Sequence, residues 1–165
     1  MRNIKTIFIL VLSLILFAVS CSNEGTTGGE TDNTETTETI DAKDFPKGLE
    51  GTYQDEKVVS IGRTGILFDT KVSYYETTKT TKIEGAWLKD GVTPPDTYRG
   101  SASIEKWKQT KKGGNPIKLE GEYYSEPNKE KYTIIYDYAS ETLIGTCVHP
   151  DVTALFNGKQ ISKQP

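Results

Sequence analysis

Apolar and polar side chains alternate along several stretches between residues 48 and 165. The clearest stretch, 64–76, places one set of apolar residues on the same side of an extended chain: Ile66, Phe68, Val72 and Tyr74. The same alternation occurs at 116–124 and 130–138. A period of two over these lengths predicts half-buried β-strands. Runs rich in β-branched and aromatic residues predict further strands near 51–61, 81–89, 97–109 and 141–148.

Gly, Pro, Asn and Asp separate these stretches and predict short turns at 90–96, 112–115 and 127–128, and Ala139-Ser140 marks a further turn. Because short loops join antiparallel neighbours, the sequence predicts an all-β fold. We expect an antiparallel meander of about seven to eight strands that forms a small barrel or a strongly curled sheet.

Two segments allow more than one interpretation. Ile104 and Trp107 are three residues apart, which is a helical spacing, but a bulged strand produces the same phase slip and is the interpretation we favour. Residues 151–156 are expected to form a helical turn, followed by a short strand at 159–162.

A five-residue pattern occurs three times, at 49–53, 83–87 and 119–123. Each copy reads apolar, Glu, Gly, any residue, aromatic. A glycine inside a strand relieves crowding where a sheet coils or a ring lies across the backbone. Chance similarity remains the alternative. The first copy, with Gly48 before it, resembles the Gly-x-Trp first strand of lipocalin-like barrels, although Tyr53 takes the place of the tryptophan.

The N-terminal segment has the three parts of a secretory signal. Arg2 and Lys5 precede a thirteen-residue stretch, 7–19, in which only Ser13 is polar. A bilayer core of about 30 Å needs roughly 20 apolar residues, so this stretch predicts a signal peptide and not a transmembrane helix.

The end of that stretch, Ala18-Val19-Ser20-Cys21, resembles the lipobox of bacterial lipoproteins. The resemblance implies cleavage after residue 20 and a lipid on Cys21 that holds the protein in the bacterial cell envelope. Ser22 is not the aspartate that retains such proteins at the inner membrane, which favours the outer membrane or the cell surface. An ordinary secretory signal with a chance cysteine is the alternative.

Residues 21–47 are rich in threonine and acidic residues and predict a disordered tether ahead of a β domain at 48–165. The tether has seven acids and two lysines, a net charge of −5. The remaining sixteen acids are balanced by sixteen bases, since four of the twenty lie at or before Lys47. A neutral domain has no broad field to attract nucleic acid, so we expect no nucleic-acid partner.

The sequence contains few groups suited to catalysis. Cys147, His149 and Asp151 alternate, which could suggest metal ligands or a thiol–imidazole pair. Side chains two apart on a strand begin about 6.5–7 Å apart, and zinc sites normally recruit a further ligand. The alternative, in which Cys147 packs as a small apolar residue, is the better explanation. We therefore predict no metal, no cofactor and no enzymatic activity.

Aromatic residues are the main candidates for binding, because tyrosine and tryptophan suit contact surfaces and sugar stacking. Adjacent tyrosines must place one ring on each face of a sheet. The candidate binding surface comprises Tyr74, Tyr75, Trp87, Trp107, Tyr123 and Tyr124. The basic stretch 106–112 could contact an anionic glycan or a partner, or could be a solvated strand end next to a turn.

These observations together predict a membrane-anchored lipoprotein whose β domain is a binding module. Its ligand could be a small apolar molecule in the mouth of the barrel, a glycan or a protein. A structural accessory subunit of an envelope assembly and, third, an envelope hydrolase are the alternatives. A hollow interior would favour a small ligand, whereas a filled one would favour contact on the outer surface.

Overall fold

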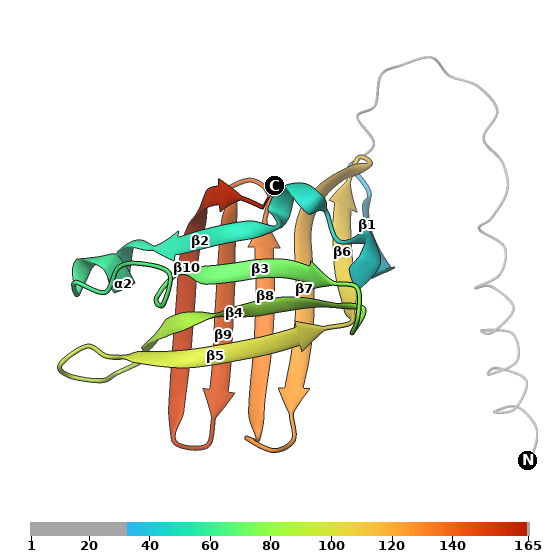
Figure 1. Cartoon of the computed structure of the whole chain (residues 1–165). Helices are drawn as coiled ribbons and strands as arrows, with labels where there is room; N and C mark the ends of the chain where they lie inside the picture. Colours follow the sequence, from blue (N-terminus) through green and yellow to red (C-terminus); the bar gives the residue numbers. More distant parts are fainter. Residues whose placement is uncertain (1–32, 165) are drawn as a thin grey trace, which may run out of the picture. The chain divides into compact units, whose positions relative to one another are not determined.

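The computed structural model describes residues 33–164, and the predicted signal peptide and Cys21 lie outside these residues (Figure 1). The ten strands are β1 (Glu35–Asp41), β2 (Gly51–Asp55), β3 (Thr70–Tyr75), β4 (Thr80–Lys89), β5 (Thr97–Ile104), β6 (Lys106–Lys112), β7 (Asn115–Ser125), β8 (Glu130–Asp137), β9 (Thr142–His149) and β10 (Val152–Lys163). The helical elements are η2 (Ala42–Asp44), η3 (Lys47–Leu49) and α2 (Glu56–Ser60). Over the described range, no helix has the length and apolar character needed to span a membrane.

Every strand pair is antiparallel, and the order across the sheet is β1-β6-β7-β8-β9-β10-β2-β3-β4-β5. Strands β2–β5 form one meander and β6–β10 another, and β10 joins them by pairing with β2 along one part and with β4 along another. The two meanders cross in Figure 1, with β2–β5 in front of the upright strands β7–β10. The predicted all-β fold with a strongly curled antiparallel sheet is confirmed.

The corner between the two meanders explains the three-residue spacing of Ile104 and Trp107. Strand β5 ends at Ile104, Glu105 interrupts the ladder, and β6 begins at Lys106. Both Ile104 and Trp107 are buried, because the interruption shifts the alternation by one residue. The helical alternative is therefore wrong, and the favoured bulged strand is replaced by two strands, β5 and β6, separated by the single residue Glu105.

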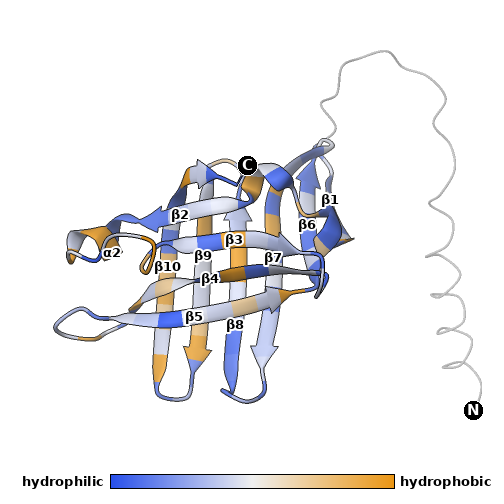
Figure 2. Ribbon diagram, in the orientation of Figure 1, coloured by the Kyte–Doolittle hydropathy of each residue, from blue (hydrophilic) through white to orange (hydrophobic). Residues whose placement is uncertain are grey.

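The interior between the meanders is filled with large side chains. Five aromatic residues are almost completely buried: Tyr53, Trp87, Trp107, Tyr132 and Phe156. Glycines make room for two of these rings. A Cβ on Gly145 would lie 2.8 Å from the Trp87 ring, and one on Gly121 would lie 2.9 Å from Trp107. Hydrophobic residues accordingly occur on strands of both meanders (Figure 2).

Three predicted elements are wrong in detail. The strand predicted at 51–61 stops at Asp55, whose carboxylate accepts a hydrogen bond from the Lys57 amide and begins α2. The strand predicted at 64–76 begins only at Thr70, because the chain turns through Gly62 and Gly65, which have positive φ angles. The helical turn predicted at 151–156 belongs instead to β10, which pairs with β9 and buries Ala154 and Phe156.

The predicted disordered tether is wrong for residues 35–47. Strand β1 pairs with β6 along its whole length, so an acidic segment lies beside the lysine-rich stretch 106–112, with Glu38 2.6 Å from Lys111. The following residues, Ala42 and Phe45, are buried, and the Phe45 ring centroid lies 4.9 Å from that of Trp107. The β domain therefore begins near residue 35, since backbone pairing and a buried ring offset the polar composition of the segment.

Candidate functional site

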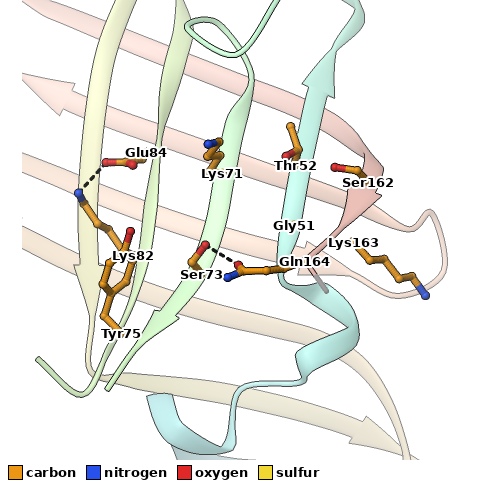
Figure 3. Close-up of a pocket in the computed structure, with 10 residues that line it drawn as sticks. All are labelled: Gly51, Thr52, Lys71, Ser73, Tyr75, Lys82, Glu84, Ser162, Lys163 and Gln164. Atoms are coloured by element: carbon orange, nitrogen blue, oxygen red, sulfur yellow. Dashed lines mark hydrogen bonds and ion pairs between the residues drawn. The ribbon is translucent and has the colours of Figure 1, made fainter. Parts of the chain in front are cut away.

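An open hollow of about 400 Å³ lies on the outer face of β2–β4, beside the end of β10 (Figure 3). Its lining residues are mostly polar by type and include three lysines and a single acid. The residues are Gly51, Thr52, Lys71, Ser73, Tyr75, Lys82, Glu84, Ser162, Lys163 and Gln164. We refer to this hollow as the β2–β4 groove.

The alternation of β3 and β4 places these side chains in the groove. On β3, Thr70 and Val72 are buried, so Lys71, Ser73 and Tyr75 point to the outside. On β4, Lys82 and Glu84 flank the buried Ile83. The register pairs Ser73 with Lys82 and Lys71 with Glu84, which brings the outward residues of the two strands together.

Charge in the groove is predominantly positive. Lys82 Nζ lies 2.6 Å from Glu84 Oε2 and 5.8 Å from the centre of the Tyr75 ring. The hydrogen bond from Lys82 to Glu84 raises the pKa of the lysine. Lys71 and Lys163 form no ion pair with any residue of the described chain. The groove can therefore attract an anion, and the ring of Tyr75, which is 44% exposed, can stack against a flat ligand.

The C-terminal residues form one wall of the groove. Ser73 Oγ donates to Gln164 Oε1 at 2.7 Å, and the Gln164 amide donates to the Glu50 carbonyl at 3.1 Å. Gly51 allows this close approach, because a Cβ at its position would lie 2.1 Å from the Ser162 carbonyl oxygen. Gly51, the glycine of the first copy of the repeated pattern, thus allows close packing here, as Gly121 of the third copy does in the core.

A second hollow, of about 340 Å³, shares Lys71 and Glu84 with the β2–β4 groove and continues across β5. It contains Arg99 together with Ile66 and Leu67, which are 70% and 58% exposed. The outer face of β2–β5 thus presents a continuous surface with cations at its centre and an apolar pair at one border.

The structure does not bring the six predicted surface aromatics together. Trp87 and Trp107 are buried in the core, where their indole nitrogens donate to Thr70 and Thr81, so the prediction that they form a binding surface is wrong. Tyr74 and Tyr123 are half-buried, and Tyr124 is exposed on β7. Of the six, only Tyr75 lines the β2–β4 groove. The alternation of residues 64–76 places Lys71 and Ser73 on the side opposite the apolar residues. The sequence does not predict that these two residues pair with Glu84 and Lys82.

Residues in and just before η3 belong to the core. Leu49 and Phe45 are buried there, and the Tyr53 hydroxyl donates to the Leu49 carbonyl at 2.8 Å. A hollow of about 470 Å³ lies beside η3, lined in part by Tyr136 and Tyr138.

The alternating residues Cys147, His149 and Asp151 do not form a reactive group. Cys147 is fully buried, and burial raises the pKa of its thiol. His149 Nδ1 accepts a hydrogen bond from the Asp151 amide at 3.1 Å, which occupies that nitrogen. In residues 33–164 no group of three potential metal ligands occurs. The explanation of Cys147 as a packed core residue accounts for this arrangement.

A carboxylate near the end of the core, Glu130, has a more specific environment. It is 5% exposed and accepts hydrogen bonds from the Tyr98 hydroxyl, from the Tyr132 hydroxyl at 2.8 Å and from the Asn128 amide at 3.3 Å. Burial alone would raise the pKa of Glu130, but these donors outweigh it and the net shift is downward. The hydrogen bond from Tyr98 connects β5 to β8 through Glu130.

No protein-family model matches the chain, and neither the curated proteins nor the solved structures yield a match.

Proposed function

We propose that the protein is a lipid-anchored lipoprotein of the bacterial envelope whose β domain binds an acidic glycan in the β2–β4 groove. The observation that carries the proposal is the position of Lys71, which has no ionic partner within the described chain and lies on the same face as Lys82 and the exposed Tyr75. Carboxylate or sulfate groups on a sugar chain would supply the missing anion.

The remaining lining of the groove suits the neutral part of such a ligand. Hydroxyls from Thr52, Ser73 and Ser162 can exchange hydrogen bonds with sugar hydroxyls, and Tyr75 offers a ring for stacking. The polar lining and the filled interior both disfavour a small apolar ligand. An acidic saccharide therefore uses more of the groove than the other ligands we considered.

Binding can be measured by calorimetry with a uronic-acid oligosaccharide and with its neutral counterpart of equal length. A hydrogen bond to a charged group contributes about 1.5–3 kcal/mol, so Lys71→Ala should weaken binding of the acidic ligand about tenfold or more. Tyr75→Ala should weaken binding of both ligands. Affinity for the acidic ligand should fall as salt is added, because screening shortens the range of exposed charges.

Lys131→Ala is the matched control, since Lys131 is an exposed lysine on the outer face of the other meander. If Lys71→Ala and Lys131→Ala weakened binding equally, the attraction would be a general effect of charge and the proposed groove would be wrong. Equal affinity for the acidic and the neutral oligosaccharide would likewise contradict the role of the lysines.

The anchor is tested separately. Cys21→Ser should abolish incorporation of labelled acyl chains and release the protein from the membrane fraction, because two or more chains are needed for stable attachment. Membrane retention of the Cys21→Ser variant would exclude lipid on this residue as the anchor, without bearing on the groove.

A further inference from the structure

The outer face of β8, β9 and β10 has an uncharged centre. The register of these strands aligns their outward residues in rows across the sheet, and the two central rows are Thr133-Thr146-Leu155 and Ile135-Ile144-Asn157. Charged residues occur only in the two outermost rows, with Lys131 in one and Asp137 and Lys159 in the other. We refer to this surface as the β8–β10 face.

Large apolar side chains on this face are open to solvent. Val148 is 49% exposed, Leu155 41% and Ile144 37%. An antiparallel sheet with one face in water normally carries polar residues on that face, as β3 and β4 do with Lys71 and Lys82. On β9, by contrast, none of the four outward residues, Thr142, Ile144, Thr146 and Val148, is charged.

We propose that a second copy of the chain covers the β8–β10 face, related to the first by a two-fold axis that runs across the strands along the row Ile134-Gly145-Phe156. This axis superposes the two central rows, so that Ile144 of one copy lies over Thr146 of the second copy. The face is then self-complementary, as a two-fold interface requires.

Charge complementarity distinguishes a second copy from other occupants. Lys131 and Asp137 lie at opposite ends of β8, at equal distances along the strand from Ile134. The two-fold axis therefore places Lys131 of each copy, which also pairs with Glu122 of its own chain, opposite Asp137 of the other, at the ends of two central rows that carry no charge. A lipid surface or an apolar peptide would leave Asp137 without a cation.

Strand β7 limits the extent of the contact. Its outward acids Glu120 and Glu122 would approach their counterparts in the second copy, although each already pairs with a lysine of its own copy, Lys118 at 3.0 Å and Lys131 at 3.2 Å. The contact is therefore centred on β9, with β7 outside it.

The size of the face sets the strength of the association. Three strands about 4.8 Å apart and about eight residues long cover roughly 26 Å by 14 Å, or about 370 Å². Stable complexes bury about 800 Å² on each partner, so the pair should dissociate readily in dilute solution. Anchoring both copies to one membrane would raise their effective concentration and favour the pair there.

The test is thiol crosslinking of the full-length chain in membranes of the cells that express it. Thr146→Cys places a thiol next to the proposed axis, and a short bismaleimide should join two copies of this variant into a dimer. Ser101→Cys, on the outer face of β5, should give little dimer. The parent chain, without an added cysteine, is the third sample. A dimer in this sample would have formed through an unlipidated Cys21 and would show that the anchor proposal, and not the interface proposal, has failed.

Two substitutions in the Thr146→Cys background test the interface itself. Ile144→Lys introduces a charge into the uncharged central rows and should reduce the dimer at least fivefold, whereas Ile161→Lys, at an exposed position outside the face, should leave it unchanged. The double exchange Lys131→Asp with Asp137→Lys should restore the dimer that Lys131→Asp alone reduces.

Equal crosslinking of the Thr146→Cys and Ser101→Cys variants would overturn the proposal. An adduct with a mass other than that of two chains would also overturn it, in favour of a different partner. Loss of the dimer in the double exchange, in a variant whose thermal unfolding matches that of Lys131→Asp, would exclude the two-fold arrangement.

Discussion

Phe45 is the residue that decides whether the segment before η3 belongs to the folded domain. The side chain is 4% exposed, and its ring contacts Trp107 at a centroid distance of 4.9 Å. Truncation of a buried phenylalanine to alanine costs about 3–5 kcal/mol, part of which is the loss of an aromatic pair. Because small domains are stable by only about 5–15 kcal/mol, Phe45→Ala should remove a large share of the stability.

Urea unfolding followed by tryptophan fluorescence measures this loss. With a denaturant dependence of about 2 kcal/mol per molar, the midpoint should fall by about 1.5–2.5 M. The emission of the folded variant should also shift to longer wavelength, because Trp107 loses its cover. Tyr124→Ala, which truncates an aromatic residue that is 52% exposed, should change the free energy of unfolding by no more than about 0.5 kcal/mol.

A loss below about 1 kcal/mol for Phe45→Ala, with unchanged emission, would refute this account. The segment 35–47 would then contribute little to the fold, and the original expectation of a tether up to residue 47 would be the better description of it.

Three further predictions concern the core and the groove. Glu130 has a lowered pKa in the folded protein. Its contribution to stability is therefore present above the ordinary glutamate pKa of about 4.3 and is lost as pH falls below that value. Glu130→Gln should therefore flatten the fall in unfolding free energy between about pH 5 and pH 3. An unchanged slope would show that the Tyr98 and Tyr132 hydroxyls do not stabilise the ionised form. Gly51→Ala should lower the thermal unfolding midpoint and also weaken glycan binding, because the added Cβ would displace Ser162. Gly114→Ala is the control: Gly114 has a positive φ and open space around it, so this substitution should affect stability alone. Cys147 should resist alkylation at neutral pH until the chain unfolds, because its thiol is buried and has a raised pKa. Rapid modification of the folded protein, detected by mass spectrometry, would contradict that burial.

The strands that the sequence predicts correctly are those with a consistent inward side. In β8, Tyr132, Ile134 and Tyr136 are all buried, so the alternation of the sequence and that of the structure agree. The segment 64–69 follows the same rule in sequence, but its Ile66 points into solvent because the glycines before it turn the chain away from the sheet. Alternation alone does not detect such a turn.

Strand β1 could not be predicted from its own residues. Its threonines and acids offer almost no apolar side chain, and its order comes from pairing with the lysines of β6, which lie about 70 residues later in the chain. The eight strands predicted become ten for this reason and because the stretch 97–109 is divided at Glu105.

The candidate site illustrates the same limit. The outward positions of β3 were predictable, yet the groove depends on which strands pair with it and in which register, and that information is spread over β2, β4 and β10. Tryptophan was expected on the surface because of its frequency in binding sites, but here Trp87 and Trp107 fill the interior, where nearby glycines accommodate their rings.

The pairing of β1 with β6 has a mechanical consequence. Any pull on the polypeptide ahead of residue 33 reaches the folded body first through this outermost strand, which is held by a seven-residue ladder. Load applied along the strand must break these bonds together, whereas load applied across it opens them one after another. The direction of tension would thus determine which of two events comes first. Either the domain resists extension as a unit, or β1 detaches from β6 and lengthens the chain before Phe45 leaves the core.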